Sequence, residues 1–589
     1  MHYLSLLLSL GLAVLPQQAN AQQPVCPLLG PVFPPVQHLA KSSAVTNAIA
    51  HLDKTFKELE RNGTFHELNT TLYVQAFSAS DTLFQHGYVP SAMKGFLTSG
   101  KLDENSVFRI GSVSKLLTVY TLLAEVGMDH MNDPVTKWVP ELARAAKKGK
   151  GDPTRQVQWN EITIGQLCGH MSGISRNFGF FDLESLIGSP KNDPEKYGFP
   201  ILGKNEQRKC DLADPELGAC SRKKFFNGIT SNNHFPITSS GNTPVYSNLA
   251  YQILAYGLEG MTGKTFDKSF QSSLLKPLSM KRTSLEAPKG KINAVIPENE
   301  LLSGWNNTWG DGSPYGGMFS TSADLTRLGQ SILKSSILAP ATTRAWLKPV
   351  THTADLHISV GMPWEIRRTL VPLGSSGTRV VDLYAKNGGV GLYTAIIVIS
   401  PDHGIGYVTL FAGPSRDVLL SYIPDLLAQT LLPAAEEAAR EATVARFTGT
   451  FQGPDTKVTL EMDDTLVVQN WTRGDVDVLA TLAAMWWPGL EVTPILRLYP
   501  MIEGNKKMSF RGTFDAKGLN VSEPEPDTEV NVAYMSTGPF SGGCLSWGGV
   551  DSLTYGSVGV DDFEFKLDQS GKATELQVRV ARETLKKVN

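Results

Sequence analysis

A serine and a lysine three residues apart, Ser112 and Lys115, are the residues of this sequence best placed to do chemistry. Positions i and i+3 share one face of a helix, so a lysine amine at this spacing can reach a serine hydroxyl. A serine hydroxyl is nearly inert at neutral pH and needs an adjacent base. Lysine can act as that base where burial or a nearby cation lowers its pKa. The pair is therefore a candidate nucleophile and base, although the same spacing occurs at four other places in the sequence.

The position of Ser112 distinguishes it from the other serine–lysine pairs of the same spacing. Ser112 opens an apolar-periodic helix after a strand-like run, and that helix is expected to end at Gly127. The partial positive charge of a helix N-terminus favours negative charge that develops there. The other pairs lie in polar or loop-like sequence, before a proline or late in a helix; they are Ser91/Lys94, Ser221/Lys224, Ser273/Lys276 and Ser331/Lys334.

Two later segments supply candidate partners for this pair, in chain order. Tyr246 and Asn248 lie in a Tyr-Ser-Asn sequence directly before an apolar helical stretch. Lys386-Asn387-Gly388-Gly389 precedes the apolar run 393–399, which predicts a buried strand. Glycines after a cation let backbone N–H groups approach a substrate carbonyl, because glycine has no side chain in the way. Taken singly, each segment also has a structural interpretation: a core aromatic at Tyr246, a solvated strand end at Lys386 and a turn at Gly388-Gly389.

The three ordered motifs resemble those of the serine β-lactamase and penicillin-binding-protein superfamily. The Gly-Ser-Val-Ser-Lys and Tyr-Ser-Asn forms are similar to the class C β-lactamases and their esterase and peptidase relatives. The similarity covers about residues 45–430 and includes the segments 133–140, 164–174 and 316–325. It implies an α/β (α+β) domain in which helices flank an antiparallel sheet. Residues 447–451 resemble the start of the lipocalin-like domain that follows this fold in some fungal relatives.

The resemblance implies a role for each matched residue. Ser112 would accept the acyl group, while Lys115 and Tyr246 activate it and pass a proton to the leaving group. The backbone N–H groups of Ser112 and Gly389 would form the oxyanion hole. The remaining residues, expected to supply electrostatics and substrate contact, are Lys386, Asn248 and Gly388.

Two positions qualify this assignment. The family's β-lactamases carry threonine where Asn387 stands, and its hydroxyl helps to hold a substrate carboxylate. The departure weakens the expectation of β-lactam hydrolysis more than that of serine acylation. His170, in another family loop, is expected to be structural.

The expected function is therefore a serine hydrolase that acts on an ester or amide through a Ser112 acyl-enzyme, with β-lactams and peptides among the candidate substrates. Two alternatives remain open. One is an acyltransferase of the same fold, which hands the acyl group to another alcohol or amine. The other is a catalytically silent binding protein, although such a protein need not keep Ser112, Lys115 and Tyr246.

Composition narrows the classes of partner. The chain has 589 residues, 41% of them hydrophobic and 19% charged, and its formal net charge is −3. This is typical of a globular protein and gives no electrostatic bias towards nucleic acid. The expected partner is a small-molecule or peptide acyl substrate. The sequence implies no cofactor, its cysteines and histidines show no metal-ligand spacing, and the oligomeric state stays open.

Changes in sequence texture predict two domains after a signal peptide. Residues 1–21 hold an apolar run and then Ala19-Asn20-Ala21, a small-x-small pattern that suits signal peptidase. A catalytic domain is expected over 22–440, with 175–242 as a long loop insertion. Short alternating runs predict a small antiparallel β-barrel over 441–589.

The signal peptide predicts a secreted protein, and the alternative is a buried N-terminal helix. No later segment approaches the roughly 20 apolar residues that span a bilayer. Cys210 and Cys220 are the favoured disulfide, Cys26 and Cys544 are a second candidate pair, and Cys168 is expected to be a buried thiol. Five sequons are candidate N-glycosylation sites: Asn62, Asn69, Asn306, Asn470 and Asn520.

Overall fold

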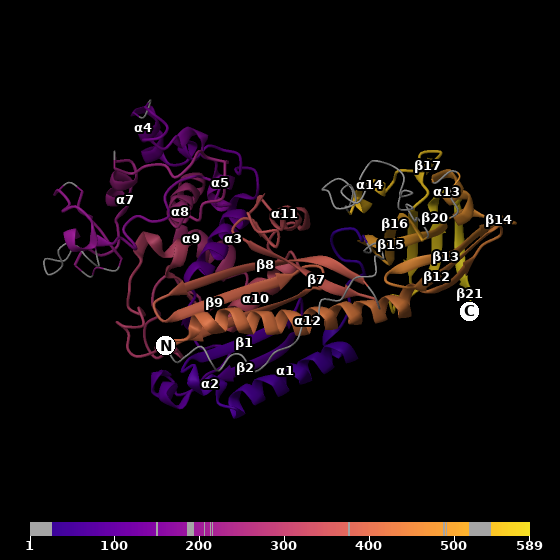
Figure 1. The fold of residues 1–589 in the computed structure, drawn as a ribbon, viewed down its shortest axis with the longest axis horizontal. Helices are drawn as coiled ribbons and strands as arrows, with labels where there is room; N and C mark the ends of the chain where they lie inside the picture. Colours follow the sequence, from indigo (N-terminus) through magenta and orange to yellow (C-terminus); the bar gives the residue numbers. More distant parts are fainter. Residues whose placement is uncertain are drawn as a thin grey trace, which may run out of the picture.

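The computed structural model describes residues 26–588 except 149–150, 185–193, 205, 213, 215, 232, 375–376, 487–488, 490–491 and 518–543. The expected signal peptide and the sequon at Asn520 lie outside the described residues. A large domain of sheet and helices is joined to a smaller β-barrel by one long helix, α12 (Figure 1). The two-part architecture that the sequence predicts is therefore the one observed.

The centre of the large domain is an eight-stranded antiparallel sheet of order β2-β1-β10-β9-β8-β7-β6-β5. The segment 386–389 lies within strand β8 rather than in a turn before the next strand. The strands are β1 (Thr71–Ser78), β2 (Thr82–Tyr88), β5 (Thr351–His352), β6 (Ile358–Val360), β7 (Glu365–Leu373), β8 (Gly377–Val390), β9 (Tyr393–Ser400) and β10 (Ile405–Ala412).

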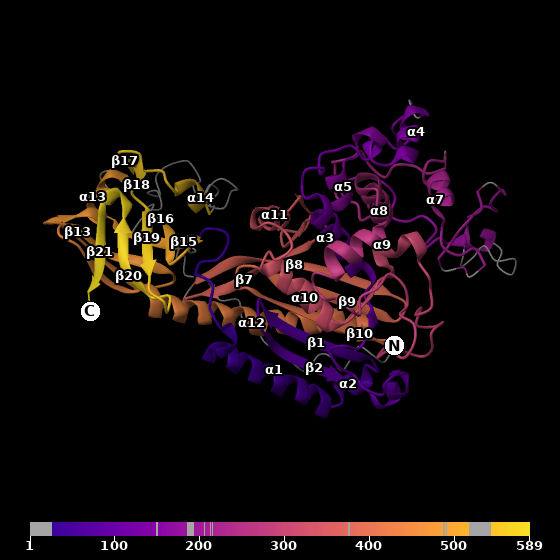
Figure 2. The same ribbon diagram turned by 180° about the vertical axis from the view of Figure 1, so that it is seen from behind.

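Helices cover both faces of this sheet (Figures 1 and 2). On one face lie α1 (Ser43–Arg61) and α12 (Arg416–Phe447), and on the other lie α3 (Ser114–Val126), α8 (Leu249–Thr262) and α10 (Ser322–Leu333). The remaining helices and the small strand pair are α2 (Thr64–Glu67), α4 (Pro140–Lys148), α5 (Ile164–Cys168), α7 (Arg222–Ile229), α9 (Phe266–Ser269), α11 (Pro340–Trp346), β3 (Phe108–Arg109) and β4 (Phe319–Ser320).

The helix that follows Ser112 is a core helix. Every residue of α3 from Ser114 to Leu123 is buried, so this helix has no solvent face to vary. Gly127 ends it with a φ of 66°, a conformation that glycine adopts without steric cost. The turn directly before α3, which holds Ser112, lies against the backbone of Gly388 in β8, and this contact fixes the place of Ser112.

Helix α12 connects the two domains and runs through residue 440, where the sequence places the domain boundary. Among the described residues, α12 is the one helix whose length and apolar composition would allow it to cross a membrane. Its side chains Leu419, Ile423 and Leu427 are nevertheless buried in the core that it forms with α1 and the sheet. We therefore assign α12 to the packed interior of the large domain.

The insertion 175–242 is not wholly a loop, and the sequence prediction is wrong in this respect. It contains helix α7, whose N-cap Ser221 accepts a hydrogen bond from the Lys224 N–H at 3.4 Å. Phe225 and Phe226 of this helix are buried in the main core. A disulfide joins Cys210 to Cys220, the pair favoured by the sequence, and closes the segment in front of α7.

The C-terminal domain is an eight-stranded antiparallel barrel of order β12-β11-β21-β20-β19-β16-β15-β13, closed by pairing of β12 with β13. Strand β20 ends at Val578, where a 3-10 turn follows. Its elements are β11 (Gly449–Gln452), β12 (Thr456–Met462), β13 (Leu466–Arg473), β14 (Val476–Asp477), α13 (Val478–Trp486), β15 (Thr493–Gly504), β16 (Lys507–Lys517), α14 (Ser546–Gly549), β17 (Thr554–Tyr555), β18 (Val558–Gly559), β19 (Asp562–Leu567), β20 (Ala573–Val578) and β21 (Glu583–Val588).

Side chains fill the inside of this barrel. Phe565 lies at its centre, with ring centroids 5.0 Å from Phe447, 5.9 Å from Phe451 and 5.1 Å from Phe510. Aromatic pairs at such distances add to the stability gained from burial. The barrel is therefore a packed core like that of other small barrels.

The N-terminal segment fastens the two domains together. Cys26 forms a disulfide with Cys544 of the barrel domain, as the second candidate pairing required. Val32 and Phe33 are buried with Tyr499 of the barrel and with Leu373 of β7. The contacts of this one segment thus involve both domains.

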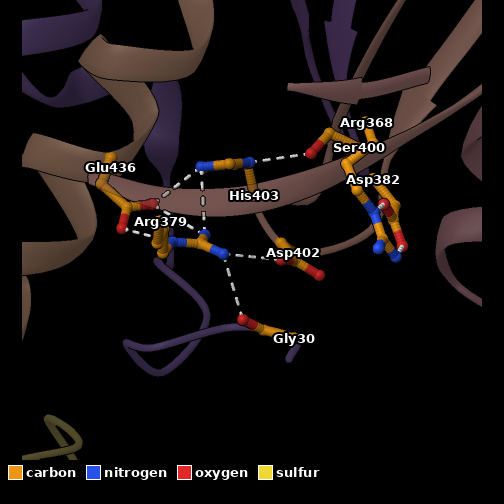
Figure 3. Close-up of polar contacts among 8 residues, drawn as sticks. All are labelled: Gly30, Arg368, Arg379, Asp382, Ser400, Asp402, His403 and Glu436. Carbon is orange, nitrogen blue, oxygen red and sulfur yellow. Dashed lines mark hydrogen bonds and ion pairs between the residues drawn. The ribbon is translucent and has the colours of Figure 1, made fainter. Parts of the chain in front are cut away.

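A buried ion cluster holds the N-terminal segment and α12 against the sheet of the large domain (Figure 3). Arg379 of β8 donates to both carboxylate oxygens of Glu436 in α12, at 2.8 and 2.9 Å, and to Asp402 at 2.8 Å. It also donates to the Gly30 carbonyl at 3.1 Å, and the His403 ring contacts Glu436 at 2.8 Å. Because every charge here has an opposite partner, we interpret the cluster as structural.

Candidate active site

Ser112 lies in a 3-10 turn, η3 (Gly111–Val113), directly before α3. The Lys115 ammonium, one turn further on, donates to the Ser112 hydroxyl at 2.9 Å. It also donates to the Asn248 side-chain carbonyl at 2.7 Å and to the Tyr315 backbone carbonyl at 2.6 Å. All three donors of this ammonium are therefore occupied, and one of them is directed at the predicted nucleophile.

The surroundings of Lys115 prepare it to accept a proton. Its side chain is fully buried. Burial lowers the pKa of Lys115 to about 8, the Lys386 ammonium contributes in the same direction, and Tyr246 opposes them. An amine with this pKa is partly neutral near physiological pH, as a base for the Ser112 hydroxyl must be.

Tyr246 stands between the two lysines. Its ring centroid lies 4.9 Å from the Lys115 nitrogen and 5.4 Å from the Lys386 nitrogen. Burial by itself would raise the pKa of Tyr246, but the ammonium groups of Lys115 and Lys386 outweigh it and lower the pKa to about 8. The phenol also interacts with the Ser112 hydroxyl, so it can take or return the same proton.

The His170 ring supports Tyr246 from one side. The two rings stack with centroids 4.3 Å apart and an angle of 22° between their planes. The His170 Nδ1 atom accepts the Ser247 N–H at 3.1 Å. Burial and the neighbouring cations keep the pKa of His170 well below its usual range, so the ring is neutral. His170 therefore fixes the position of the Tyr-Ser-Asn segment without contacting Ser112 itself.

The Asn248 side chain is hydrogen-bonded to Lys115 and does not point into solvent. Its carbonyl accepts from Lys115, and its amide donates to the Asn177 side chain at 2.6 Å. Asn177 belongs to the start of the insertion, so the insertion reaches the site. The side chain expected to contact substrate is thus already engaged on both of its polar ends.

Lys386 is buried in β8 and paired with Glu365, a residue that the sequence analysis did not predict to be part of the site. Its ammonium donates to Glu365 of β7 and to the Asn387 carbonyl, the latter at 2.8 Å. Glu365 also accepts from the Asn387 N–H at 3.2 Å and from the Asn387 side-chain amide at 2.5 Å. Burial lowers the pKa of Lys386, but Glu365 and Tyr246 outweigh it and raise the pKa, so this lysine stays charged.

The glycines of β8 lie against the backbone of η3. A Cβ atom on Gly388 would lie 2.3 Å from the Ser112 nitrogen and 2.3 Å from the Ile110 carbonyl oxygen. A Cβ atom on Gly111, where φ is 50°, would lie 2.6 Å from the Gly389 nitrogen. Only residues without side chains allow this approach.

Strand geometry directs the second oxyanion donor into the site. The Asn387 N–H points away from β9, since it donates to Glu365 on the opposite edge. Successive N–H groups of a strand point to alternate edges, so the Gly389 N–H points the same way as that of Asn387. It thereby lies beside η3 and Ser112, where an oxyanion hole requires it.

The structure brings together all the site residues that the sequence predicts: Ser112, Lys115, Tyr246, Asn248, Lys386, Gly388 and Gly389. Sequence reasoning missed Glu365 and the Tyr315 carbonyl. Glu365 has no motif around it, and Tyr315 acts through its backbone, so neither gives a signal in residue type. The cluster holds a nucleophile, a proton acceptor and oxyanion donors, the set that acyl transfer needs.

A separate surface hollow of about 390 Å³ lies between α4 and α7. None of the residues of the Ser112 cluster line it. Glu141, the acidic residue among those that line it, is paired with Arg222 at 2.9 Å.

Comparison with known proteins agrees with this geometry. The sequence profile of the β-lactamase family matches residues 82–432, and the profile described as "Beta-lactamase-like-like, C-terminal domain" matches 438–589. The chain belongs to the β-lactamase family. Both the resemblance seen in the motifs and the division into a catalytic domain and a barrel agree with these matches.

Individual relatives are similar over most or part of the chain. A "Beta-lactamase-like protein" of Arthroderma benhamiae is 27% identical over 96% of this chain and 96% of its own. A "Probable hydrolase M10" of Phoma sp. is 26% identical over 66% of this chain and 62% of its own. The solved class C β-lactamase of Rhodobacter sphaeroides is 16% identical over 66% of this chain and all of its own, with a TM-score of 0.42.

Proposed function

We propose that the protein is a serine hydrolase that cleaves esters or amides through an acyl-enzyme on Ser112. The observation that carries the proposal is the contact between Lys115 and Ser112 at 2.9 Å, made by an amine whose pKa burial lowers to about 8. Membership of the β-lactamase family and the name "Probable hydrolase" of the Phoma relative support a hydrolytic reaction.

The proposed reaction has the following order of steps. Neutral Lys115, with Tyr246 beside it, takes the proton of the Ser112 hydroxyl as its oxygen bonds to the substrate carbonyl. The carbonyl oxygen becomes negative and is stabilised by the N–H groups of Ser112 and Gly389. The bond to the leaving group then breaks, and that group receives the proton held by the Lys115–Tyr246 pair. Water releases the acyl group by the reverse sequence of proton transfers.

We also propose that the protein is secreted. The disulfides Cys26–Cys544 and Cys210–Cys220 support this, because disulfides persist in oxidising compartments. Among the described sequons, Asn62, Asn306 and Asn470 are exposed and Asn69 is half-buried, so at least three are accessible to glycosylation. Protein recovered from the medium of a eukaryotic host should begin at Gln22 and shift in mass on deglycosylation; retention in the cells would contradict the proposal.

Turnover tests the hydrolase proposal. We expect the protein to hydrolyse a p-nitrophenyl ester, with nitrocefin assayed in parallel to compare a strained amide. Ser112→Ala should abolish turnover of either substrate. Ser91→Ala is a matched control, because Ser91 is an exposed serine with the same spacing to a lysine. Equal activity of Ser112→Ala and wild type would move the nucleophile elsewhere, and a folded wild type inert to both substrates would contradict the proposal.

A further inference from the structure

The cation of Lys386 is neutralised within the chain. Glu365 is the first residue of β7 and stands opposite Ala385 of β8, so β7 begins where the Lys386 segment enters the site. Beyond this point, none of the described strands pairs with this edge of β8. The Glu365 side chain occupies that edge and accepts hydrogen bonds from Lys386 and from the N–H and the side-chain amide of Asn387.

Counting donors shows what remains for a substrate. The Lys386 ammonium has three N–H groups, and its partners are Glu365, the Asn387 carbonyl and Tyr246. The Asn387 amide is directed at Glu365 as well. A substrate carboxylate arriving here would find its natural donors engaged and a like charge in its place.

The distance to the reacting carbonyl makes this charge relevant. Asn387 and Gly389 are two residues apart in β8, about 7 Å at the rise of an extended strand. The Glu365 carboxylate accepts the N–H of the first residue, and the N–H of the second forms part of the oxyanion hole. A charged group of the substrate that is a few bonds from the scissile carbonyl, on the side of β8, would therefore lie beside Glu365.

We propose that Glu365 is a specificity-determining residue, whose carboxylate fills the anion position beside Lys386 and restricts the enzyme to substrates without a carboxylate on that side of the scissile bond. The inference rests on the proposed function. Preferred substrates are then neutral esters or amides, and compounds with a carboxylate near the scissile bond are poor ones. Like-charge contacts in such sites are costly enough to set preference.

A matched pair of esters tests this proposal. The meta-carbamoylphenyl and meta-carboxyphenyl esters of phenylacetic acid share one acyl group and differ in the charge of the leaving group. Wild type should have a kcat/KM at least about tenfold higher for the carbamoyl ester. Glu365→Gln frees the Lys386 cation and should change the ratio by about 10- to 100-fold in favour of the carboxylate.

Two further variants assign the effect to position. Asp382→Asn also removes one negative charge, but from a residue of β8 that is paired with Arg368. This variant should leave the ratio of kcat/KM for the two esters unchanged. Arg176 is an exposed cation lying 4.7 Å from the Tyr246 ring centroid, so it too can influence an anionic substrate. The gain from Glu365→Gln should persist in an Arg176→Gln background. If the gain from Glu365→Gln disappeared in this background, Arg176 would be the residue that sets the charge preference, and the proposal would be overturned.

The outcomes separate this inference from the proposed function. A wild type that prefers the carboxylate ester would contradict the role of Glu365 even if Glu365→Gln failed to fold. An unchanged ratio in a Glu365→Gln protein that still hydrolyses the carbamoyl ester would also contradict it. Loss of all ester hydrolysis in folded wild type would instead contradict the acyl-enzyme itself.

Discussion

One buried cation of the barrel and one at the candidate active site have different kinds of partner. In the barrel, buried Arg497 is paired with two aspartates, Asp464 at 3.0 Å and Asp515 at 2.8 Å. In the catalytic domain, buried Lys115 contacts neutral oxygen atoms of Ser112, Asn248 and Tyr315, and the described residues offer its ammonium no carboxylate partner within ion-pair distance.

The difference separates a group that stabilises from a group that reacts. Burying a charge without an opposite partner is costly, and the usual response is a shift of pKa towards the neutral form. Lys115 shows that shift, whereas the aspartates keep Arg497 charged. Perturbed groups of this kind cluster at functional sites. The barrel has an apolar interior, and the shifted lysine lies in the large domain, where we propose that the reaction occurs.

The largest expected effect comes from exchanging each cation for an uncharged side chain. Lys115→Met should lower kcat/KM for a neutral aryl ester by at least about 10³-fold, because nucleophile and base act as a unit. Its stability to urea should stay near that of wild type, because removal of a costly buried ammonium offsets the loss of its hydrogen bonds to Asn248 and Tyr315. Ester kinetics and urea unfolding measure the two effects.

Arg497→Met should behave in the opposite way. It leaves two aspartates without their cation, which lowers the stability of the barrel by about 3–5 kcal/mol. Below the unfolding transition its kcat/KM should stay within about twofold of wild type, as for a distant site. If Arg497→Met lost activity as severely as Lys115→Met, the distinction between the two domains would not hold.

The next largest effect concerns the contact between β8 and η3. Gly388→Ala places a methyl group 2.3 Å from the Ser112 nitrogen, so the backbone must move and the oxyanion donors separate. We expect kcat/KM for the neutral ester to fall by about 10²–10³-fold, the usual cost of one such donor. A methyl group on Gly389 would meet Thr394 at an ordinary 3.5 Å, so Gly389→Ala is the steric control with the smaller loss. Equal losses in the two variants would argue against this placement of the oxyanion hole.

The smallest effect is a shift of the pH profile. Lys115 and Tyr246 both have a pKa of about 8, so the pair titrates together and its base form increases as pH rises through 8. Below this pH, kcat/KM should fall about tenfold per pH unit. Because the Lys386 ammonium lowers both pKa values, Lys386→Met should move the rising limb to higher pH. A flat profile between pH 6 and 9, or a move to lower pH, would refute the role given to the pair.

Much of the catalytic centre could be predicted from the sequence, because its residues form local patterns. Ser112 and Lys115 lie one turn apart, and Lys386 precedes two glycines in a strand. Glu365 could not be predicted, since the register of β7 against β8 alone brings it to Lys386, 21 residues later in the chain. The Tyr315 carbonyl is a backbone atom in a π-helical turn and leaves no mark in residue type.

The fold shows the same division between local and distant information. Helix α1 follows from the spacing of Val45, Leu52 and Phe56, which are all buried. Helix α7 could not be predicted from its polar, glycine-rich surroundings. It is stabilised by two phenylalanines that pack into the main core, against residues far away in the sequence. Hydrophobic periodicity can be read within a single helix or strand. Whether a short helix of low intrinsic stability forms depends instead on its tertiary packing.

Identification of the nucleophilic residue with a covalent probe tests the central claim most directly. Wild type is incubated with a neutral fluorophosphonate, digested, and mapped by mass spectrometry, beside Ser112→Ala and Ser91→Ala. The account predicts one adduct, on Ser112, present in wild type and Ser91→Ala and absent in Ser112→Ala. An adduct on another residue, or no adduct on folded wild type, would contradict it.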